Sequence, residues 1–124
     1  MQINIKAKNL ELTSSINDYI NKRIKSIEKL VKDDSGALFE IEVGRTTFHH
    51  KKGDIFRAEI NLKFKGESLY ASSEKEELYT AIDEVRNEVK SKLLTYKKKR
   101  ETVLKRGGRQ IKDLLKNIRF RSRG

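Results

Sequence analysis

The fold is decided most clearly by residues 73–96, which read SEKEELYTAIDEVRNEVKSKLLTY. Apolar residues recur here at the three- and four-residue intervals of one helix face, at Leu78, Ile82, Val85, Val89, Leu93 and Tyr96. Ser73 and Glu76 have the spacing of a capping box. Glu74 and Glu77 add negative charge at the start, and residues 97–100 add positive charge near the end, as the helix dipole favours. The stretch is therefore predicted to be a long helix with one buried face.

Working outward, the preceding residues alternate between strand and helix patterns. Apolar residues at every second position over 3–7, 39–43, 56–64 and 69–71 indicate four strands that are buried on one side. Helical spacing over 16–31 indicates another amphipathic helix, which ends near 33–36. Thr13, Ser14 and Ser15 offer N-caps for it, and Ser15 with Asp18 fits a capping box.

This element order predicts an α+β fold, β-α-β-β-β-α. The last three strands follow one another through short connections, including a turn at Lys65-Gly66, and are expected to be antiparallel. Both helices have a single apolar stripe. We therefore expect a two-layer sandwich in which a four-stranded sheet carries the two helices on one face.

The positive charge of the chain is concentrated at its C-terminal end. Residues 97–124 contain 12 Lys or Arg against Glu101 and Asp113, a net of +10 out of +11 for the whole chain, which leaves residues 1–96 at +1. A polycation of this kind attracts polyanions and releases counterions when it neutralises phosphates. A nucleic acid is the expected partner, although a basic tail can also serve only as a solvated solubility segment.

Both predicted helices also arrange basic residues on faces away from the core. The first helix places four lysines in one sector opposite its apolar stripe, namely Lys22, Lys25, Lys29 and Lys32. On the second helix, Arg86, Lys90 and Lys97 share a flank with Tyr79 and Asp83, and this flank continues into residues 98–100. Such rows suit contacts with phosphates, but solvent-facing helix positions are also commonly charged without any ligand.

The run Leu78-Tyr79-Thr80-Ala81-Ile82-Asp83, set in a long helix that ends in Lys97-Lys98-Lys99-Arg100, resembles the bacterial ribosome hibernation promoting factor family. The opening residues 1–5 and 9–13 resemble the start of the same family, and the similarity extends over residues 1 to 100. The resemblance implies a fold like that of double-stranded-RNA-binding domains. It also implies a protein that occupies the decoding channel of the small ribosomal subunit, excludes mRNA and tRNA, and silences translation under stress.

The resemblance also implies which residues contact rRNA. They are the basic residues on the outer helix faces: Lys22, Lys25, Lys29, Arg86, Lys90, Lys92, Lys97, Lys98, Lys99 and Arg100. Lys92 is included because Glu88 and Ser91 stand where relatives often carry basic residues. The expected partners are the small ribosomal subunit and its rRNA, with no membrane, and the protein is expected to be a monomer away from the ribosome.

Residues 101–124 are expected to form a basic, flexible tail after a ribosome-binding αβ domain at 1–100, as in a short member of the family. Lys105, Arg106 and Arg109 flank Gly107-Gly108, an arrangement similar to RGG-type RNA contacts. Residues 111–118 have helical spacing, but a helix this short is marginal alone and should order against rRNA or a ribosomal protein, unless it folds back on the body.

No catalytic or cofactor site is predicted. The chain has no cysteine, so a thiolate metal or redox site is excluded and the cytoplasm is the expected compartment. His49 and His50 are neighbours in a polar loop and lack further ligands, and no nucleophile and base are set at a readable spacing. No targeting or transmembrane segment is apparent.

Two other functions remain open from the residues alone. The fold order and charge also suit a general double-stranded-RNA-binding module or RNA chaperone. The amphipathic spacing in the tail also suits a protein that binds a membrane surface or a partner.

Overall fold

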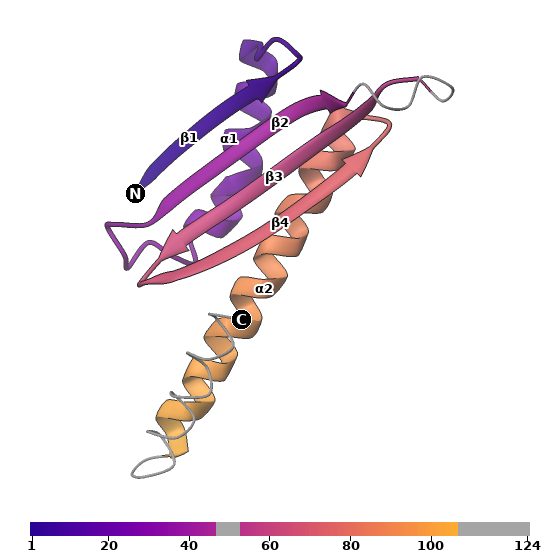
Figure 1. Cartoon of the computed structure of the whole chain (residues 1–124). Helices are drawn as coiled ribbons and strands as arrows, with labels where there is room; N and C mark the ends of the chain where they lie inside the picture. The colour runs from indigo at the N-terminus through magenta and orange to yellow at the C-terminus, as the bar shows by residue number, and fades with distance from the viewer. Residues whose placement is uncertain (47–52, 107–124) are drawn as a thin grey trace. The chain divides into compact units, whose positions relative to one another are not determined.

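The computed structural model describes residues 1–46 and 53–106, with side chains described as far as Thr102. The elements, in chain order, are β1 (Gln2–Lys8), α1 (Ser14–Glu28), β2 (Leu38–Thr46), β3 (Ile55–Phe64), β4 (Glu67–Lys75) and α2 (Leu78–Arg106) (Figure 1). The predicted β-α-β-β-β-α order is confirmed.

The four strands form one mixed sheet in the order β1-β2-β3-β4. β1 pairs in parallel with β2, and the connection between them passes through α1, as parallel neighbours require. β2, β3 and β4 pair antiparallel. The tight β3–β4 connection uses Lys65 and Gly66, which both have positive φ (49° and 78°), the sign that a two-residue type I′ hairpin needs.

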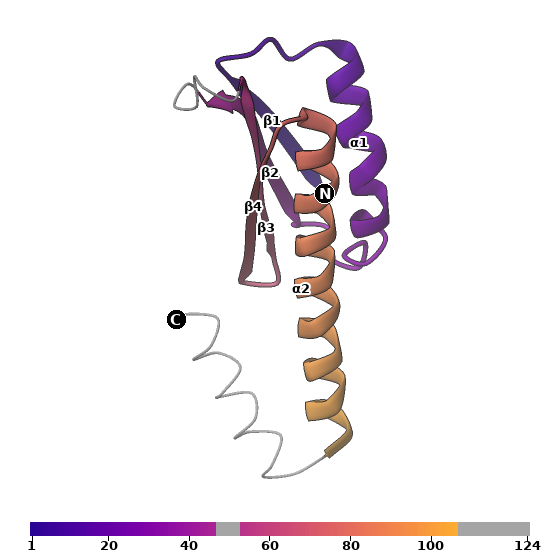
Figure 2. The same cartoon turned by 90° about the vertical axis from the view of Figure 1, so that its right-hand side faces the viewer.

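α1 and the part of α2 that ends at Lys90 lie on the same face of the sheet, as predicted (Figure 2). The buried apolar side chains of the strands and helices form the core between these two layers. The sheet contributes the alternate side chains of each strand, and the part of α2 up to Lys90 contributes Leu78, Ala81, Ile82, Val85 and Val89. From α1 the buried side chains are Ile20, Ile24 and Ile27. The opposite face of the sheet, here called the open face, carries no helix from residues 1–46 and 53–106.

The N-cap of the first helix is one of the three predicted candidates. Thr13 is the N-cap, and its Oγ1 accepts a hydrogen bond from the Ile16 N–H at 3.2 Å. The capping box at Ser15 and Asp18 is therefore wrong, because Ser15 already lies inside the first turn. α1 also ends earlier than expected, at Glu28. Tighter turns then bury Val31 without extending the helix.

The second helix also begins later than predicted. Ser73 belongs to β4, where it pairs with Ala58 and is buried, so the Ser73–Glu76 capping box is wrong. Strand pairing continues through Lys75, and the first helical hydrogen bond runs from the Ala81 N–H to Glu77 O at 3.1 Å. At the other end α2 continues past residue 100 to Arg106, because residues 101–106 contain no helix breaker.

The chain divides into two compact units, and the boundary falls inside α2. The first unit is Met1–Lys90, which holds the sheet, α1 and the beginning of α2, and the second starts at Ser91. In residues 1–46 and 53–106, no helix is long and apolar enough to cross a membrane.

Candidate nucleic-acid interface

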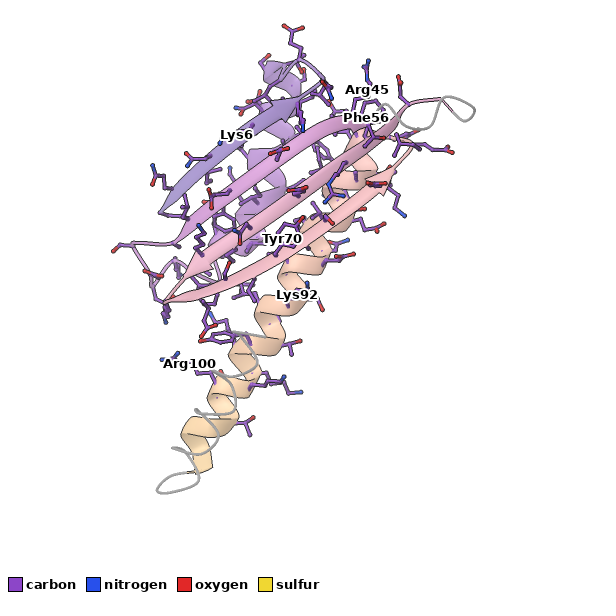
Figure 3. All side chains as sticks on the ribbon, in the orientation of Figure 1. Lys6, Arg45, Phe56, Tyr70, Lys92 and Arg100 are labelled. Atoms are coloured by element: carbon purple, nitrogen blue, oxygen red, sulfur yellow. The ribbon has the colours of Figure 1, made fainter. Side chains whose placement is uncertain are left out.

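The open face of the sheet, which is turned towards the viewer in Figure 3, carries charges of both signs, and several of them are paired with one another. Arg57 on β3 contacts Glu59 at 2.7 Å and Glu74 on β4 at 3.2 Å, and Lys63 contacts Glu40 at 3.0 Å. The hydrogen bond with Glu59, despite partial burial, raises the pKa of Arg57 above its ordinary value. Because both signs alternate on this face, it offers a polyanion little net attraction.

A hollow of about 310 Å³ lies on the open face where the ends of β1, β2 and β3 meet. Lys8 and Arg57 line it together with Glu42 and Glu59. Gly44 also lines the hollow, and a Cβ there would be tightly placed, because it would approach the Lys8 carbonyl oxygen to 3.0 Å. The mixed charge of the lining does not indicate a phosphate site.

The outer surface of α1 is basic, as the sequence predicts. Lys22, Lys25 and Lys29 are all exposed, although Lys29 is the C-cap of the helix and does not lie within it. Lys32 lies beyond the end of α1, also exposed. The lysines at positions 22, 25 and 29 therefore form one row of ammonium groups on the helix layer, pointing away from the core.

Between α1 and α2 runs a polar and aromatic strip that we call the helix seam. Its members are Tyr19, Arg23 and Ser26 of α1 with Tyr79, Asp83 and Arg86 of α2. The spacing is four and then three residues on both helices, so each turn of one helix meets the matching turn of the other. The contacts therefore advance along both helices in the same direction, and within Met1–Lys90 the two helices run side by side (Figure 2).

Asp83 is the centre of the seam. It accepts a hydrogen bond from the Tyr19 hydroxyl at 2.7 Å, and it pairs with Arg23 Nε at 3.1 Å. Burial, and next the hydrogen bond to Asp83, raise the pKa of Tyr19 above its ordinary value. The guanidinium carbon of Arg23 lies 4.9 Å from the Tyr19 ring centroid, a cation–π distance. One carboxylate thus fixes two side chains of the neighbouring helix.

Arg86 is less exposed than the sequence suggests. The sequence places it on a solvent-facing flank, but the structure shows it half-buried, with Nη1 donating to Ser26 Oγ at 3.4 Å. Its Nε is buried and has no hydrogen-bond partner among the described residues. The difference arises because α1 packs along this flank of α2. Lys90, one turn later, is also half-buried.

The remaining basic positions of α2 belong to the second unit. Lys92, Lys98, Lys99 and Arg100 are exposed and Lys97 is half-buried. Arg100 donates a hydrogen bond from Nη1 to the Tyr96 hydroxyl, one turn earlier, at 3.3 Å. Four consecutive basic residues on a helix cover more than one of its sides, so this stretch can meet phosphates from several directions.

Several predicted positions lie outside what is described. Arg109, the Gly107-Gly108 pair, the helical spacing at 111–118 and the two histidines at 49–50 fall outside the described residues. Lys105 and Arg106 are within α2, but their side chains are not described. Across residues 1–46 and 53–106, no group of three His, Cys, Asp or Glu is placed to hold a metal ion.

Sequence reasoning missed Tyr19, Arg23 and Ser26 as part of the surface. The signal was present: their four-then-three spacing matches that of Tyr79, Asp83 and Arg86. It could be used only with the knowledge that the two helices are adjacent and run in the same direction, which single-helix periodicity does not provide.

The sheet, its one-sided helix layer and the basic outer surface place this chain among small α+β proteins with a β-α-β-β-β-α order. More specifically, the chain belongs to the family described as "Sigma 54 modulation protein / S30EA ribosomal protein", whose pattern matches residues 3–101. The family resemblance seen in the sequence is confirmed.

Individual relatives agree with this assignment. Proteins named ribosome hibernation promoting factor from Azotobacter vinelandii and Klebsiella oxytoca are each 26% identical over 99 residues, which cover 80% of this chain and 85% and 96% of those proteins. The N-terminal domain of Protein Y from Thermus thermophilus has a TM-score of 0.63 at 22% identity, covering 75% of this chain and 96% of that one. A ribosomal subunit interface protein from Coxiella burnetii has a TM-score of 0.66 at 16% identity, covering 78% and 98%. These two structures support the fold.

Proposed function

We propose that this chain is a ribosome hibernation factor. It binds the small ribosomal subunit in the decoding channel, contacts rRNA through its helix layer and the basic part of α2, and blocks the binding of mRNA and tRNA. The observation that carries the proposal is the family match over residues 3–101, in which curated relatives are named for ribosome hibernation. The action is occlusion by a bound protein, with one copy per ribosome.

The distribution of charge supports the helix layer as the RNA-facing side. Exposed lysines of α1 stand on it in a row, whereas on the open face Arg57 and Lys63 are paired with carboxylates and Lys6 lies opposite Glu42 in the strand pairing. RNA phosphates are recognised through unneutralised Lys and Arg, and each contact releases condensed counterions. The side with unpaired ammonium groups therefore has the larger electrostatic gain.

The proposed rRNA contacts are those that the sequence predicts, with one change of role. Arg86 acts at the seam: one of its nitrogens is held by Ser26 at 3.4 Å, and the guanidinium has further donors for a phosphate. The remaining contacts are exposed or half-buried lysines and one arginine, namely Lys22, Lys25, Lys29, Lys90, Lys92, Lys97, Lys98, Lys99 and Arg100.

Residues 1–100 are proposed to be the ribosome-binding part, and residues 101–124 a basic extension that strengthens binding. The extension holds eight Lys or Arg, among them Lys105, Arg106 and Arg109, against two acids. A polycation of this size raises association rates by electrostatic steering and adds phosphate contacts that do not depend on sequence.

Sedimentation through sucrose gradients tests the proposal. The purified chain is mixed in turn with small subunits, large subunits, intact ribosomes and a bulk duplex RNA. We expect it to travel with small subunits and intact ribosomes, at about one copy each, and to favour them over duplex RNA. Equal affinity for duplex RNA would instead show a general RNA-binding module, and flotation with vesicles would show a membrane-surface protein.

Two triple variants locate the binding face. The first replaces Lys22, Lys25 and Lys29 by Ala on α1, and the matched control replaces Lys6, Lys8 and Lys63 by Ala on the open face. Both remove three exposed positive charges. We expect only the first to lower the salt dependence of small-subunit binding, by roughly 2–3 in the log–log slope. Equal losses in both variants would show that net charge, and not the helix layer, determines binding.

A further inference from the structure

The exposed end of the helix seam has features that a phosphate contact does not require. Tyr79 is 40% exposed and its ring meets the Tyr19 ring edge to face, with centroids 4.5 Å apart and planes at 83°. Arg23 covers Tyr19 at 4.9 Å, and its side chain is 41% exposed. Two aromatic rings and a guanidinium thus stand together at the surface of the helix layer.

We propose that Tyr79, supported by Tyr19 and Arg23, is a stacking platform for one unpaired nucleobase of the bound RNA. This inference rests on the proposed function, since it takes RNA as the ligand of the helix layer. Single-stranded bases are commonly bound by stacking on aromatic side chains and arginine planes, and every base offers a face for this.

The platform is held in place before any ligand arrives. Asp83 accepts from the Tyr19 hydroxyl at 2.7 Å and pairs with Arg23 Nε at 3.1 Å, which fixes the ring that Tyr79 packs against and the guanidinium that lies over that ring. Tyrosine has few rotatable bonds, and a ring already packed against another loses little freedom on binding. An exposed tyrosine without such support is ordinary on a protein surface.

The local charge favours a base over a phosphate at this spot. Asp83 is 37% exposed, and its carboxylate offsets the positive charge of Arg23, so a phosphate here would gain little. Lys22 and Lys25, next to Arg23 along α1, are exposed and provide the phosphate contacts of the flanking nucleotides. The surface thus provides a stacking position close to phosphate-binding positions of α1.

The open face provides a matched control residue. Tyr70 on β4 is 45% exposed, and its hydroxyl accepts from Arg57 Nη2 at 3.3 Å (Figure 3). The same substitution at Tyr70 and Tyr79 therefore removes similar exposed aromatic surface from the two sides of the molecule.

The test uses the full chain and two RNA hairpins of equal length and charge. One hairpin carries a single bulged 2-aminopurine, and the other carries the same base paired within the stem. Fluorescence reports stacking of the probe base, and titrations over a salt series give the affinity and its salt slope. Small-subunit sedimentation is measured in parallel for every variant.

We expect Tyr79→Ala to weaken binding of the bulged hairpin by roughly 5- to 150-fold, the loss of one stacked base, and to leave the salt slope unchanged. Tyr79→Phe should keep the affinity and the fluorescence change. Tyr79→Leu preserves apolar packing but lacks a π face, so it should behave as Tyr79→Ala if stacking is the role. Tyr70→Ala should match the parent.

Three results would overturn the inference. They are equal binding of the bulged hairpin by Tyr79→Ala and the parent, full activity of Tyr79→Leu, and no preference of the parent for the bulged hairpin. The last two would point to packing, or to an apolar protein partner, as the role of Tyr79. If the parent still sediments with small subunits in these cases, the proposed function survives while the stacking site fails. If the parent binds neither RNA nor subunits, both fail.

Discussion

Arg86 donates a hydrogen bond from Nη1 to Ser26 Oγ, 3.4 Å away on the neighbouring helix. The contact joins α2 to α1 and leaves the buried Arg86 Nε without a partner in the part of the chain that is described. We therefore expect the side chain to serve two purposes, a structural one at the contact between the helices and an electrostatic one towards RNA. Substitutions here must be chosen to separate the two.

Replacing Arg86 by Met retains most of the stem and removes the charge. We expect the free energy of unfolding to change by about 1 kcal/mol or less, because one long hydrogen bond is lost and a buried unpaired nitrogen is removed with it. The salt slope of small-subunit binding should fall by ~0.7–0.9, the value for one phosphate contact. Denaturant unfolding and a binding series from low to high salt give the two quantities.

The control is Lys98→Met, at an exposed position. It should lower the slope by a similar amount with no change in stability. An Arg86→Met protein that keeps the parental slope would remove Arg86 from the contact surface.

The pair Arg23–Asp83 should couple measurably. In a double-mutant cycle with Arg23→Ala and Asp83→Asn, we expect a small but measurable coupling free energy, because both side chains are more than one third exposed and water screens the pair. Added salt should reduce it further. The Lys75–Glu84 pair, at 2.9 Å and 41% exposure on both sides, gives a comparison of the same type away from the seam.

The affinity for the small subunit should respond differently to the loss of these two ion pairs. Breaking Arg23–Asp83 should lower small-subunit affinity, since the seam side chains lose their fixed positions. Breaking Lys75–Glu84 should leave that affinity unchanged. A loss of equal size in both would argue that the seam has no special part in binding.

The stability of the seam should depend on alkaline pH. Burial and the hydrogen bond to Asp83 raise the pKa of Tyr19 above its ordinary value of 10.0. A raised pKa means that the protonated phenol stabilises the folded state below about pH 10, and that this contribution is lost as the pH rises through the elevated pKa. Tyrosinate absorbance, compared between the parent and Tyr19→Phe, reports the titration of this one group. A Tyr19 that ionises at or below 10.0 would contradict the geometry of the seam.

The C-terminal extension should add strength to binding without choosing the site. A chain ending at Arg106 keeps the whole of α2 as described and removes six Lys or Arg against Asp113. We expect weaker binding to the small subunit, mainly through slower association and most clearly at low salt, because the removed charges act by steering. Stopped-flow association rates measure this. If a peptide of residues 101–124 alone competed with initiator tRNA for the small subunit as well as the full chain does, the binding site would lie in the extension.

Much of the fold could be predicted because the sheet buries only one face. Ile3, Ile41 and Ile60 each alternate with polar neighbours, and this pattern fixes both strand and orientation. Helix starts were less predictable. Ser73 fits a capping box and an inward strand position equally well, and the pairing of β4 with β3 decides in favour of the strand.

The candidate site was predictable only in part, because some of its contacts depend on how the two helices align in the fold. The lysines of α1 face solvent wherever the helix packs, so periodicity alone finds them. Arg86 and Asp83 take their roles from residues about sixty positions away, on a helix whose alignment depends on the core. Local patterns contain no information about that alignment, and the helix seam therefore emerges only in the folded chain.

The central claim is that the protein occupies the space of mRNA and tRNA, and a competition measurement tests it most directly. Small subunits are loaded with a short mRNA and labelled initiator tRNA, and the full chain is added in increasing amounts. The account predicts that the tRNA is released in proportion to the protein added, and completely at about one copy per subunit. At lower amounts of protein, no further tRNA should be released over time. Stable binding of the protein to subunits that keep both mRNA and tRNA, or full inactivation by far less than one copy, would contradict it.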